Sequence, residues 1–339
     1  MRIGVDVMGG DNAPHPILEG ALTATTKLEA DDVVVLYGDE AVIQSALSSA
    51  TIGPASVEVV ATTELISMDE SPVDAVRGKQ DSSLVVMCKN GSQKADNPLD
   101  AVISAGNTGA FVAGSQMYLR RLKGVHRPGI AAAVPTFGGT VAFIDVGANI
   151  EPKPIHLAQY GVMGKVYAKQ ILGIENPRVA LMNVGGEEQK GTSTLKEVRD
   201  MLRAAPDINF VGYIEGRSLF DGGADVVITD GIVGNVSIKL AEGLATGLLT
   251  KIARDVAGTD PKLAEAFKPI IQKFYADYDY HEYGGAPLLG VNGISMICHG
   301  SSEARTIANA IVRVKQFATA GVNTHIASQL AVIEEVSVE

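Results

Sequence analysis

The sequence contains little cysteine and few aromatic residues. Its 339 residues include two cysteines and no tryptophan, and aromatic residues make up 5% of the chain. Two cysteines far apart in the sequence, Cys88 and Cys298, suggest neither a disulfide framework nor a zinc site, and the six histidines have no metal-ligand spacing. We therefore expect a protein of a reducing compartment, without a metal ion or other cofactor, whose core is packed mainly by Val, Ile, Leu and Ala.

Long apolar segments and an excess of positive charge are also absent. No uninterrupted apolar run reaches the roughly 18 residues that a membrane span needs, and the N-terminus lacks a basic stretch followed by an apolar one. The formal net charge of −11 argues against a general nucleic-acid-binding protein. We expect a cytoplasmic protein that has no signal peptide, does not span a membrane and does not bind nucleic acid.

One short segment differs from this acidic average. Tyr118–Pro128 contains four Lys or Arg residues and no acidic residue. Such a segment suits an acidic partner, whereas the alternative is that its side chains are solvated at a helix end or pair within the protein. The four residues are Arg120, Arg121, Lys123 and Arg127.

Strand-like and helix-like patterns alternate along most of the chain. This alternation predicts an α/β protein with a doubly wound, mostly parallel sheet between layers of helices, an α/β/α sandwich. No internal repeat or linker divides the chain, so we expect a single compact unit over residues 1–339, with a helical elaboration over 232–283. The predicted strands are 2–7, 32–37, 100–104, 140–146, 178–184, 208–214 and 225–229. The predicted helices are 14–29, 82–94, 107–122, 154–172, 193–204, 232–257, 260–277 and 301–320, and the segments 283–290 and 293–300 are interpreted as interruptions of the helical C-terminal part.

A strand that ends in closely spaced glycines is the most informative motif. In Asp100–Ala110 a short apolar strand is followed by Gly106 and Gly109, and then by the first turn of a helix. Glycines allow backbone N–H groups to approach an anion closely, and the helix N-terminus adds positive potential. The pattern predicts a phosphate-binding loop, although a tight turn in an α/β protein produces the same spacing.

Similar loops follow other predicted strands. Arg2–Val7 runs into Met8–Pro14, and Val226–Thr229 runs into Asp230–Asn235. In open α/β sheets, ligands bind beyond the carboxyl ends of the strands. We therefore expect these glycine-containing loops to converge on one polar site.

Several polar side chains in such loops are candidates for chemistry, each with a plain structural alternative. Lys190 is either a solvated surface lysine or a point charge that faces phosphate or an oxyanion. Asn235 precedes a predicted helix, where it is either the N-cap or an amide donor to a developing oxyanion. Asp145–Asn149 fits an Asx-type turn, and Ser301 or Ser302 is expected to cap the following helix, unless phosphate occupies that helix N-terminus.

The segment 262–283 has apolar residues at intervals of three and four, with lysines between them. This spacing predicts a helix with an apolar face. Such a face most often forms a core or dimer surface, and a helix that lies on a membrane surface is the alternative.

Eight short motifs occur in a fixed order along the chain. They are Val5–Asp11, Ile103–Ala110, Asp145–Asn149, Lys153–His156, Gln159–Tyr160, Thr229–Asn235, Tyr283–Ala286 and His299–Ser301. Together they resemble the bacterial phosphate acyltransferases of phospholipid synthesis, the acyl-acyl-carrier-protein:phosphate acyltransferases. The resemblance covers nearly the whole chain.

This resemblance implies a fold similar to that of the isopropylmalate dehydrogenase and phosphotransacetylase group, in a cytoplasmic homodimer that can associate peripherally with the membrane. It implies transfer of a long-chain fatty acyl group from the thioester of acyl-carrier protein to inorganic phosphate. The acyl phosphate product would serve phosphatidic acid synthesis through a downstream glycerol-3-phosphate acyltransferase. Phosphate is itself the nucleophile, so no acyl-enzyme is expected, and Lys190 and Asn235 match the catalytic pair proposed for the family.

The expected site combines these roles. Lys190 aims phosphate at the thioester, and Asn235 with backbone N–H groups stabilises the tetrahedral oxyanion. The acidic carrier protein is expected to dock on Arg120, Arg121, Lys123 and Arg127. The residues expected to bind phosphate or substrate are Asp6, Gly9, Gly10, Asp11, Ser104, Gly106, Asn107, Thr108, Gly109, Asp145, Asn149, Asp230, Gly231, Gly234, His299, Gly300 and Ser301.

Three other functions are weighed against this one. A phosphotransacylase that uses a small acyl-coenzyme A would need the same chemistry. A nicotinamide-dependent dehydrogenase of related fold is disfavoured, because the first loop lacks Gly-x-Gly-x-x-Gly. A non-catalytic, membrane-recruited scaffold of lipid synthesis would depend on residues 262–283.

Overall fold

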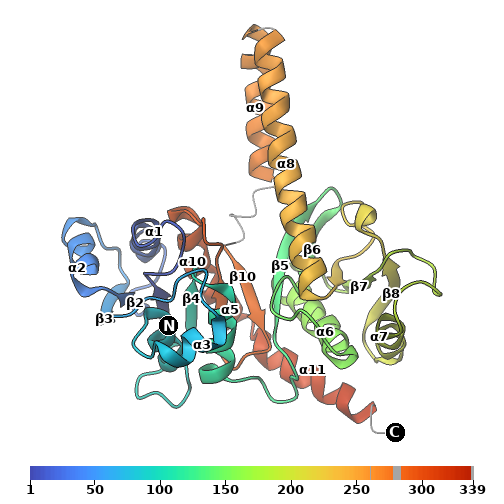
Figure 1. The fold of residues 1–339 in the computed structure, drawn as a ribbon, viewed down its shortest axis with the longest axis horizontal. Coiled ribbons are helices and arrows are strands. Elements are labelled where there is room, and N and C mark those ends of the chain that lie inside the picture. Colours follow the sequence, from blue (N-terminus) through green and yellow to red (C-terminus); the bar gives the residue numbers. More distant parts are fainter. Residues whose placement is uncertain (260, 278–283, 337–339) are drawn as a thin grey trace.

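An eleven-stranded sheet forms the centre of the protein (Figure 1). The computed structural model describes residues 1–259, 261–277 and 284–336. The strand order is β3-β2-β1-β4-β11-β10-β5-β6-β9-β7-β8. The strands are β1 (Arg2–Asp6), β2 (Val33–Gly38), β3 (Ser56–Ala61), β4 (Ala101–Ser104), β5 (Gly129–Thr136), β6 (Gly139–Ile144), β7 (Arg178–Met182), β8 (Asn209–Ile214), β9 (Val226–Ile228), β10 (Ala286–Leu289) and β11 (Ile294–Ile297).

The sheet is mostly parallel, as predicted, but its centre is antiparallel. The pairs β11–β10, β10–β5 and β5–β6 are antiparallel. On one side of them β3, β2, β1, β4 and β11 form a first parallel group, and on the other side β6, β9, β7 and β8 form a second. Three successive reversals make the two groups run in opposite directions.

The central strands β10 and β11 correct the interpretation of 283–290 and 293–300 as interruptions of a helical end. β11 pairs with β4, and β10 pairs with β5, so together they join the two parallel groups. Each strand has four residues, and glycines border them at Gly285, Gly290 and Gly293. A run this short shows no readable alternation, so its strand character depends on distant partners.

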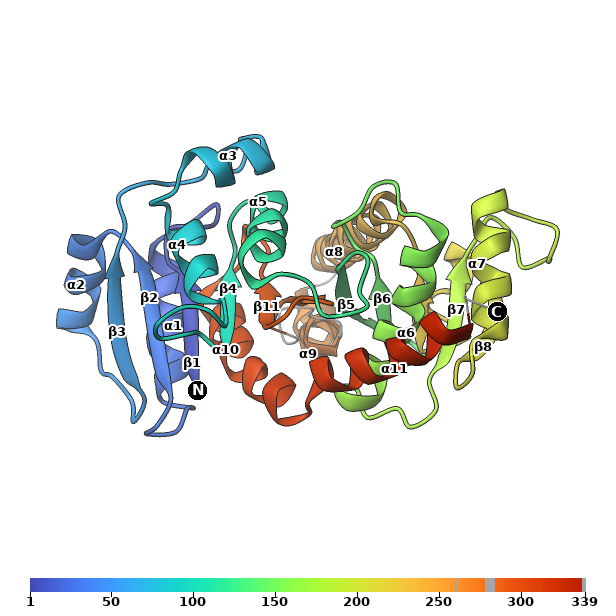
Figure 2. The same ribbon diagram turned by 90° about the horizontal axis from the view of Figure 1, so that it is seen from below.

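Helices cover both faces of the first parallel group. In Figure 2, α5 and α10 lie on opposite sides of β4. Ile17 of α1 and Ile307 of α10 belong to one hydrophobic cluster with Ile3 of β1, whereas Phe111 of α5 belongs to another with Val35 of β2. Side chains that alternate along a strand thus enter two different cores, and the predicted layered architecture is confirmed. The helices of the main body are α1 (His15–Thr25), α2 (Glu40–Ser49), α3 (Pro72–Gly78), α4 (Ser83–Asn90), α5 (Thr108–Gly114), α6 (Pro154–Gln170), α7 (Ser193–Ala204), α10 (Ala304–Thr319) and α11 (Val322–Val336), with a π-helical turn at Ser115–Leu119 and a 3₁₀ turn at Gly216–Ser218.

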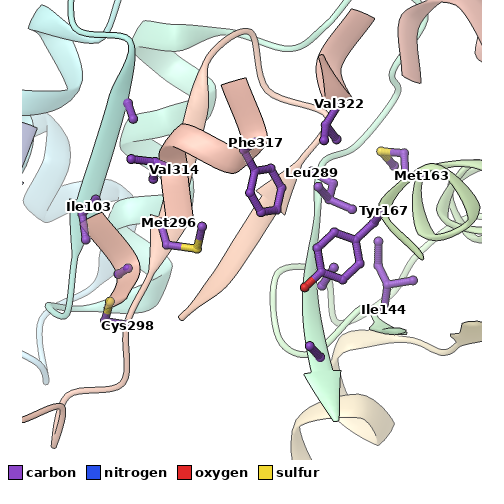
Figure 3. Close-up of a cluster of buried hydrophobic side chains, with 14 of the residues drawn as sticks. Ile103, Ile144, Met163, Tyr167, Leu289, Met296, Cys298, Val314, Phe317 and Val322 are labelled. Carbon is purple, nitrogen blue, oxygen red and sulfur yellow. The ribbon is translucent and has the colours of Figure 1, made fainter. Parts of the chain in front are cut away.

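One hydrophobic cluster continues from the first parallel group to the second (Figure 3). Ile103 of β4 and Phe317 of α10 belong to it, and so do Ile144 of β6 and Tyr167 of α6. The rings of Tyr167 and Phe317 stack with their centroids 5.8 Å apart. The two groups of strands therefore share one core on this face.

Two long helices, α8 (Gly231–Thr259) and α9 (Pro261–Asp277), project from the body side by side (Figure 1). They correspond to the predicted helical elaboration, of which residues 260 and 278–283 lie outside the described residues. α8 is the one helix among the described residues that is long and apolar enough to cross a membrane by length and composition. Length and composition alone do not distinguish a membrane span from a helix that packs against another, and α8 packs against α9.

Candidate active site

Three loops of the first parallel group meet beyond the carboxyl ends of β1, β4 and β11. The sequence predicts convergence of the loops after β1, β4 and β9, but the loop after β9 (Asp230–Asn235) lies instead against the loop after β6. The Asp11 N–H donates to the Gly300 carbonyl oxygen at 2.8 Å. A Cβ atom at Gly9 would lie 2.8 Å from the backbone nitrogen of Gly106, and one at Gly300 would lie 2.8 Å from the Asp11 carboxylate. The backbone of Gly106 therefore leaves no room for a side chain at Gly9, whereas a side chain at Gly300 would meet the Asp11 carboxylate. We call this group of loops the first loop cluster.

Asp6 lies at the base of the first loop cluster, at the end of β1. It is 2% exposed and accepts hydrogen bonds from Ser83 Oγ at 2.6 Å and Ser104 Oγ at 2.7 Å. Burial raises the pKa of the Asp6 carboxyl, and the hydrogen bonds from Ser104 and Ser83 oppose that rise. These contacts fix the loops that follow β1 and β4 to each other.

The Gly-x-x-Gly motif lies at the start of α5, as predicted. Its Asn107 side chain and the space beside Gly109 face other parts of the protein. Asn107 accepts from the Ala110 N–H at 3.0 Å as an N-cap, and its Nδ2 donates to carbonyl groups of segment 67–70 at 3.1 to 3.2 Å. A Cβ atom at Gly109 would lie 2.6 Å from Pro72 Cγ of α3. The absence of a side chain at Gly109 therefore allows α3 to pack closely, and a role in phosphate binding stays a prediction.

A second loop cluster lies beyond the carboxyl ends of β6 and β9. Asp145 is buried, and its carboxylate accepts backbone N–H groups of Ile130 and of residues 147–149 at 2.7 to 3.2 Å. Burial raises the pKa of Asp145, and these hydrogen bonds oppose the rise. The predicted Asx-type turn is confirmed, and Asn149 Nδ2 extends it to the Tyr160 hydroxyl at 2.7 Å.

Asn235 joins this second loop cluster, but it is not the N-cap that the sequence suggested. α8 begins at Gly231, and Asp230 accepts the N–H groups of Ile232 and Val233 at 2.9 Å. The Asn235 side chain is therefore released from capping, and its Nδ2 donates to the Val146 carbonyl oxygen at 3.1 Å. This hydrogen bond fixes the amide against the loop that follows β6.

The expected serine cap of α10 is also wrong. α10 begins at Ala304, its N-cap is Glu303, and no side chain caps it. Ser301 Oγ instead lies 2.7 Å from His299 Nδ1. Sequence patterns place helix ends only to within a few residues, which is enough to assign a cap to the wrong side chain.

Lys190 is exposed in the loop that follows β7. Its N–H donates to the Glu187 carbonyl oxygen at 3.0 Å. At the base of the same loop, Asn183 is buried, and its Oδ1 accepts the Val184 N–H at 2.9 Å. Because β6, β9 and β7 are parallel neighbours, the loops with Lys190 and Asn235 leave the same edge of the sheet.

Glu242 of α8 links the second loop cluster to the first. Burial raises the pKa of the Glu242 carboxyl, and the positive charges of His299 and Lys239 oppose that rise. His299 belongs to the first cluster, whereas α8 starts in the second. On a helix, Asn235, Lys239 and Glu242 lie on one face. Polar residues at this spacing in an otherwise apolar helix were a usable signal in the sequence, but Glu242 was not among the predicted residues.

The structure therefore gathers the predicted residues into two linked clusters, with Lys190 on a third loop. The four basic residues of Tyr118–Pro128 lie on the chain just before β5, which starts beside the carboxyl end of β6. The first cluster contains Asp6, Gly9, Gly10, Asp11, Ser104, Gly106, Asn107, Thr108, Gly109, His299, Gly300 and Ser301. The second contains Asp145, Asn149, Asp230, Gly231, Gly234 and Asn235.

Comparisons with known proteins identify the family of the chain. A family model described as fatty acid synthesis protein matches residues 1–325. The chain is 44% identical over 333 residues to the phosphate acyltransferase of Desulfitobacterium hafniense strain DCB-2, covering 97% of this chain and 98% of the relative. It is 42% identical over 337 residues to the phosphate acyltransferase of Citrifermentans bemidjiense, covering 97% of this chain and 93% of the relative.

Solved structures share the fold at low sequence identity. A phosphotransacetylase from Streptococcus pyogenes aligns with a TM-score of 0.57 and 14% identity, over 96% of this chain and 93% of the other. A branched-chain phosphotransacylase from Enterococcus faecalis aligns with a TM-score of 0.55 and 13% identity, over 93% of this chain and 98% of the other. The predicted similarity to the phosphotransacetylase group is confirmed for the fold.

Proposed function

The chain belongs to the fatty acid synthesis protein family and is a phosphate acyltransferase, and from this premise we propose that its acyl donor is a long-chain thioester of acyl-carrier protein. The product is an acyl phosphate for phosphatidic acid synthesis. The main support for the site is that the loops carrying Lys190 and Asn235 follow parallel neighbours β7 and β9 and leave the same sheet edge.

In the proposed reaction, a phosphate oxygen attacks the thioester carbonyl carbon. The new C–O bond gives a tetrahedral oxyanion, and its collapse breaks the C–S bond and releases the carrier-protein thiolate. Because phosphate is already an anion near neutral pH, no protein nucleophile is required, and a thiolate leaves readily without a strong general acid. The protein has to hold phosphate in line and stabilise the oxyanion.

Asn235 is suited to the oxyanion. A side-chain amide has two N–H donors, and one of them is used by the Val146 carbonyl oxygen. The second is available for the substrate carbonyl oxygen, in an orientation that the first hydrogen bond fixes. We assign Lys190 to phosphate as a mobile positive charge, because its side chain is exposed on a glycine-bracketed loop.

The first loop cluster supplies the remaining phosphate contacts in this proposal. His299 and Ser301 contribute them, because the Gly106 N–H already donates to Ser104 Oγ at 3.0 Å and the N–H groups of Met8 and Gly9 donate to the Asp6 carboxylate. Glu242 of α8 is near enough to this cluster for the charge of His299 to lower the pKa of its carboxyl against the effect of burial. Phosphate would therefore bind between the two loop clusters, within reach of the helix that carries Asn235.

The projecting helices suit a homodimer that also touches the membrane. Exposed apolar side chains recur every four residues along α8, and others lie on α9. A stripe of this kind is stable in water when a second copy covers it, and its outer end can enter a lipid surface. The protein would then be cytoplasmic and peripherally bound, close to a downstream glycerol-3-phosphate acyltransferase. The exposed residues are Val236, Leu240, Leu244, Leu248, Ile252, Leu263, Ile270 and Phe274.

Detection of acyl phosphate by mass spectrometry tests the proposed function. Purified protein should convert palmitoyl carrier protein and inorganic phosphate to palmitoyl phosphate. Palmitoyl- and acetyl-coenzyme A, assayed in parallel, distinguish the donor. Faster turnover of acetyl-coenzyme A would identify a small-acyl phosphotransacylase, and binding of vesicles without any acyl phosphate would identify a scaffold.

A further inference from the structure

Among the described residues, the positive segment before β5 forms no ion pair with an acidic side chain. Across the residues that the structure describes, ion pairs engage cations such as Arg178 with Asp225 and Lys315 with Asp32. None engages the four basic residues of Tyr118–Pro128. Ion pairs among the described residues therefore do not neutralise these cations. Arg121 Nη1 donates to the His126 carbonyl oxygen, and all four side chains are exposed.

A second element, the start of α6 with Lys153 as its N-cap, adds positive charge at the same place. His126 of the segment and His156 of α6 have ring centroids 6.3 Å apart. The pKa of His156 is lowered, first by burial and then by the positive charges of Arg127, His126, Lys153 and Arg121. The start of α6 and the segment before β5 thus form one basic surface.

This surface is held rigidly next to the second loop cluster. Gln159 is 1% exposed, and its side chain accepts the His126 N–H at 2.9 Å and donates to the Gly124 carbonyl oxygen at 2.7 Å. Asn149 of the second loop cluster donates to the Pro128 carbonyl oxygen at 2.7 Å. A backbone fixed at both ends loses little entropy when a partner binds.

We propose that Arg121, Arg127, Lys153 and His156 form a docking surface for the acidic face of the acyl-carrier protein. This inference rests on the proposed function and extends the expected docking residues from the segment before β5 to α6. Mutual repulsion among these groups destabilises the free protein, and carboxylates of the partner would remove that repulsion.

The histidine contributes as a neutral donor. His156 Nδ1 accepts the Lys153 N–H at 3.1 Å, so the proton of the neutral ring lies on Nε2. An Nε2–H can donate to a carboxylate without changing its charge state. Glutamine at position 156 should therefore preserve docking better than leucine does.

Binding of carrier protein that lacks its prosthetic arm tests the proposal directly, because such a partner contacts only the protein surface. With the full-length protein and fluorescently labelled carrier protein, anisotropy gives Kd at several salt concentrations. We expect Lys153→Glu to raise Kd by about tenfold or more and to flatten the salt dependence. The matched control is Lys27→Glu, an exposed lysine just after α1, which should change Kd by less than about twofold.

Two results would overturn the docking surface: equal Kd for the Lys153→Glu and Lys27→Glu variants, or His156→Leu binding as tightly as His156→Gln. The assay is independent of turnover. Failure to form acyl phosphate from any donor would refute the proposed function, whereas normal acyl phosphate formation with Kd insensitive to Lys153→Glu would refute the docking surface alone.

Discussion

Substitution of one glycine in α8 tests whether the second loop cluster sets the position of Asn235. A Cβ atom at Gly234 would overlap the carbonyl oxygen of Asp145 and lie 2.9 Å from its carbonyl carbon. Neither the loop of Asp145 nor the first turn of α8 can move easily. The Asp145 carboxylate holds its own loop through backbone N–H groups of Ile130 and residues 147–149, and Asp230 fixes the first turn of α8.

Gly234→Ala should therefore push α8 and the loop apart. Overpacking of this kind lowers the free energy of unfolding by about 1 to 3 kcal/mol. Because the shift acts on the residue next to Asn235, a displacement of about 1 Å should also lower turnover by about 100-fold. Denaturant unfolding and acyl phosphate formation at saturating phosphate measure the two effects.

Gly243→Ala in the same helix is the matched control. A Cβ atom there meets no heavy atom within 4 Å, and alanine favours a helix over glycine by about 0.5 to 1 kcal/mol. The control should keep its turnover and gain stability at the same protein concentration. If Gly234→Ala unfolded and turned over like Gly243→Ala, the argument that this close approach positions Asn235 would be refuted.

Two further substitutions separate catalysis from stability. Lys190→Ala should lower turnover by about 100-fold at saturating phosphate. Because Lys190 is exposed, the free energy of unfolding should change little. Lys196→Ala is the control, and near-normal turnover of Lys190→Ala would exclude a catalytic role. Burial raises the pKa of Asp32, but hydrogen bonds from Lys315 and the N-terminal ammonium outweigh it and lower the pKa from 3.8 to about 2. A lowered carboxyl pKa stabilises the fold above pH 3.8, by about 2 kcal/mol, and this stability is lost as pH falls through 2. Lys315→Met should remove much of this stabilisation at pH 7. Urea unfolding at pH 7 and pH 3 measures the free energy of unfolding of both proteins. The same pH dependence in Lys315→Met as in the unsubstituted protein would contradict the assignment.

The predicted strands and helices are present because long aliphatic runs identify them locally. Val33–Gly38, for example, is an almost continuous apolar run, and such a run predicts a strand buried on both faces. The strand is indeed buried along almost its whole length. β10 and β11 have four residues each and become strands only because β4 and β5 pair with them. Information of that kind lies in distant parts of the chain, and no local pattern contains it.

The candidate site shows the same division between local and distant information. The glycine-containing loops in the sequence indicated where backbone segments approach each other closely. The backbones at Gly9 and Gly106 do lie in contact. The expectation that all loops share one sheet edge assumed that every strand runs the same way, and the antiparallel centre of the sheet breaks that assumption. The loops instead form two clusters, each at the carboxyl ends of its own parallel group.

What joins the two clusters is α8, which the sequence analysis treated as an elaboration for dimer or membrane contact. The helix begins in the second loop cluster, and one turn beyond Lys239 its Glu242 reaches the electrostatic field of His299 in the first. Asn235, Lys239 and Glu242 share one helical face, so one side of α8 carries both the amide of the second cluster and the carboxylate that His299 influences. In the proposed function, a homodimer or membrane contact that fixes the far end of α8 would therefore also hold the Asn235 amide in place for the substrate carbonyl oxygen.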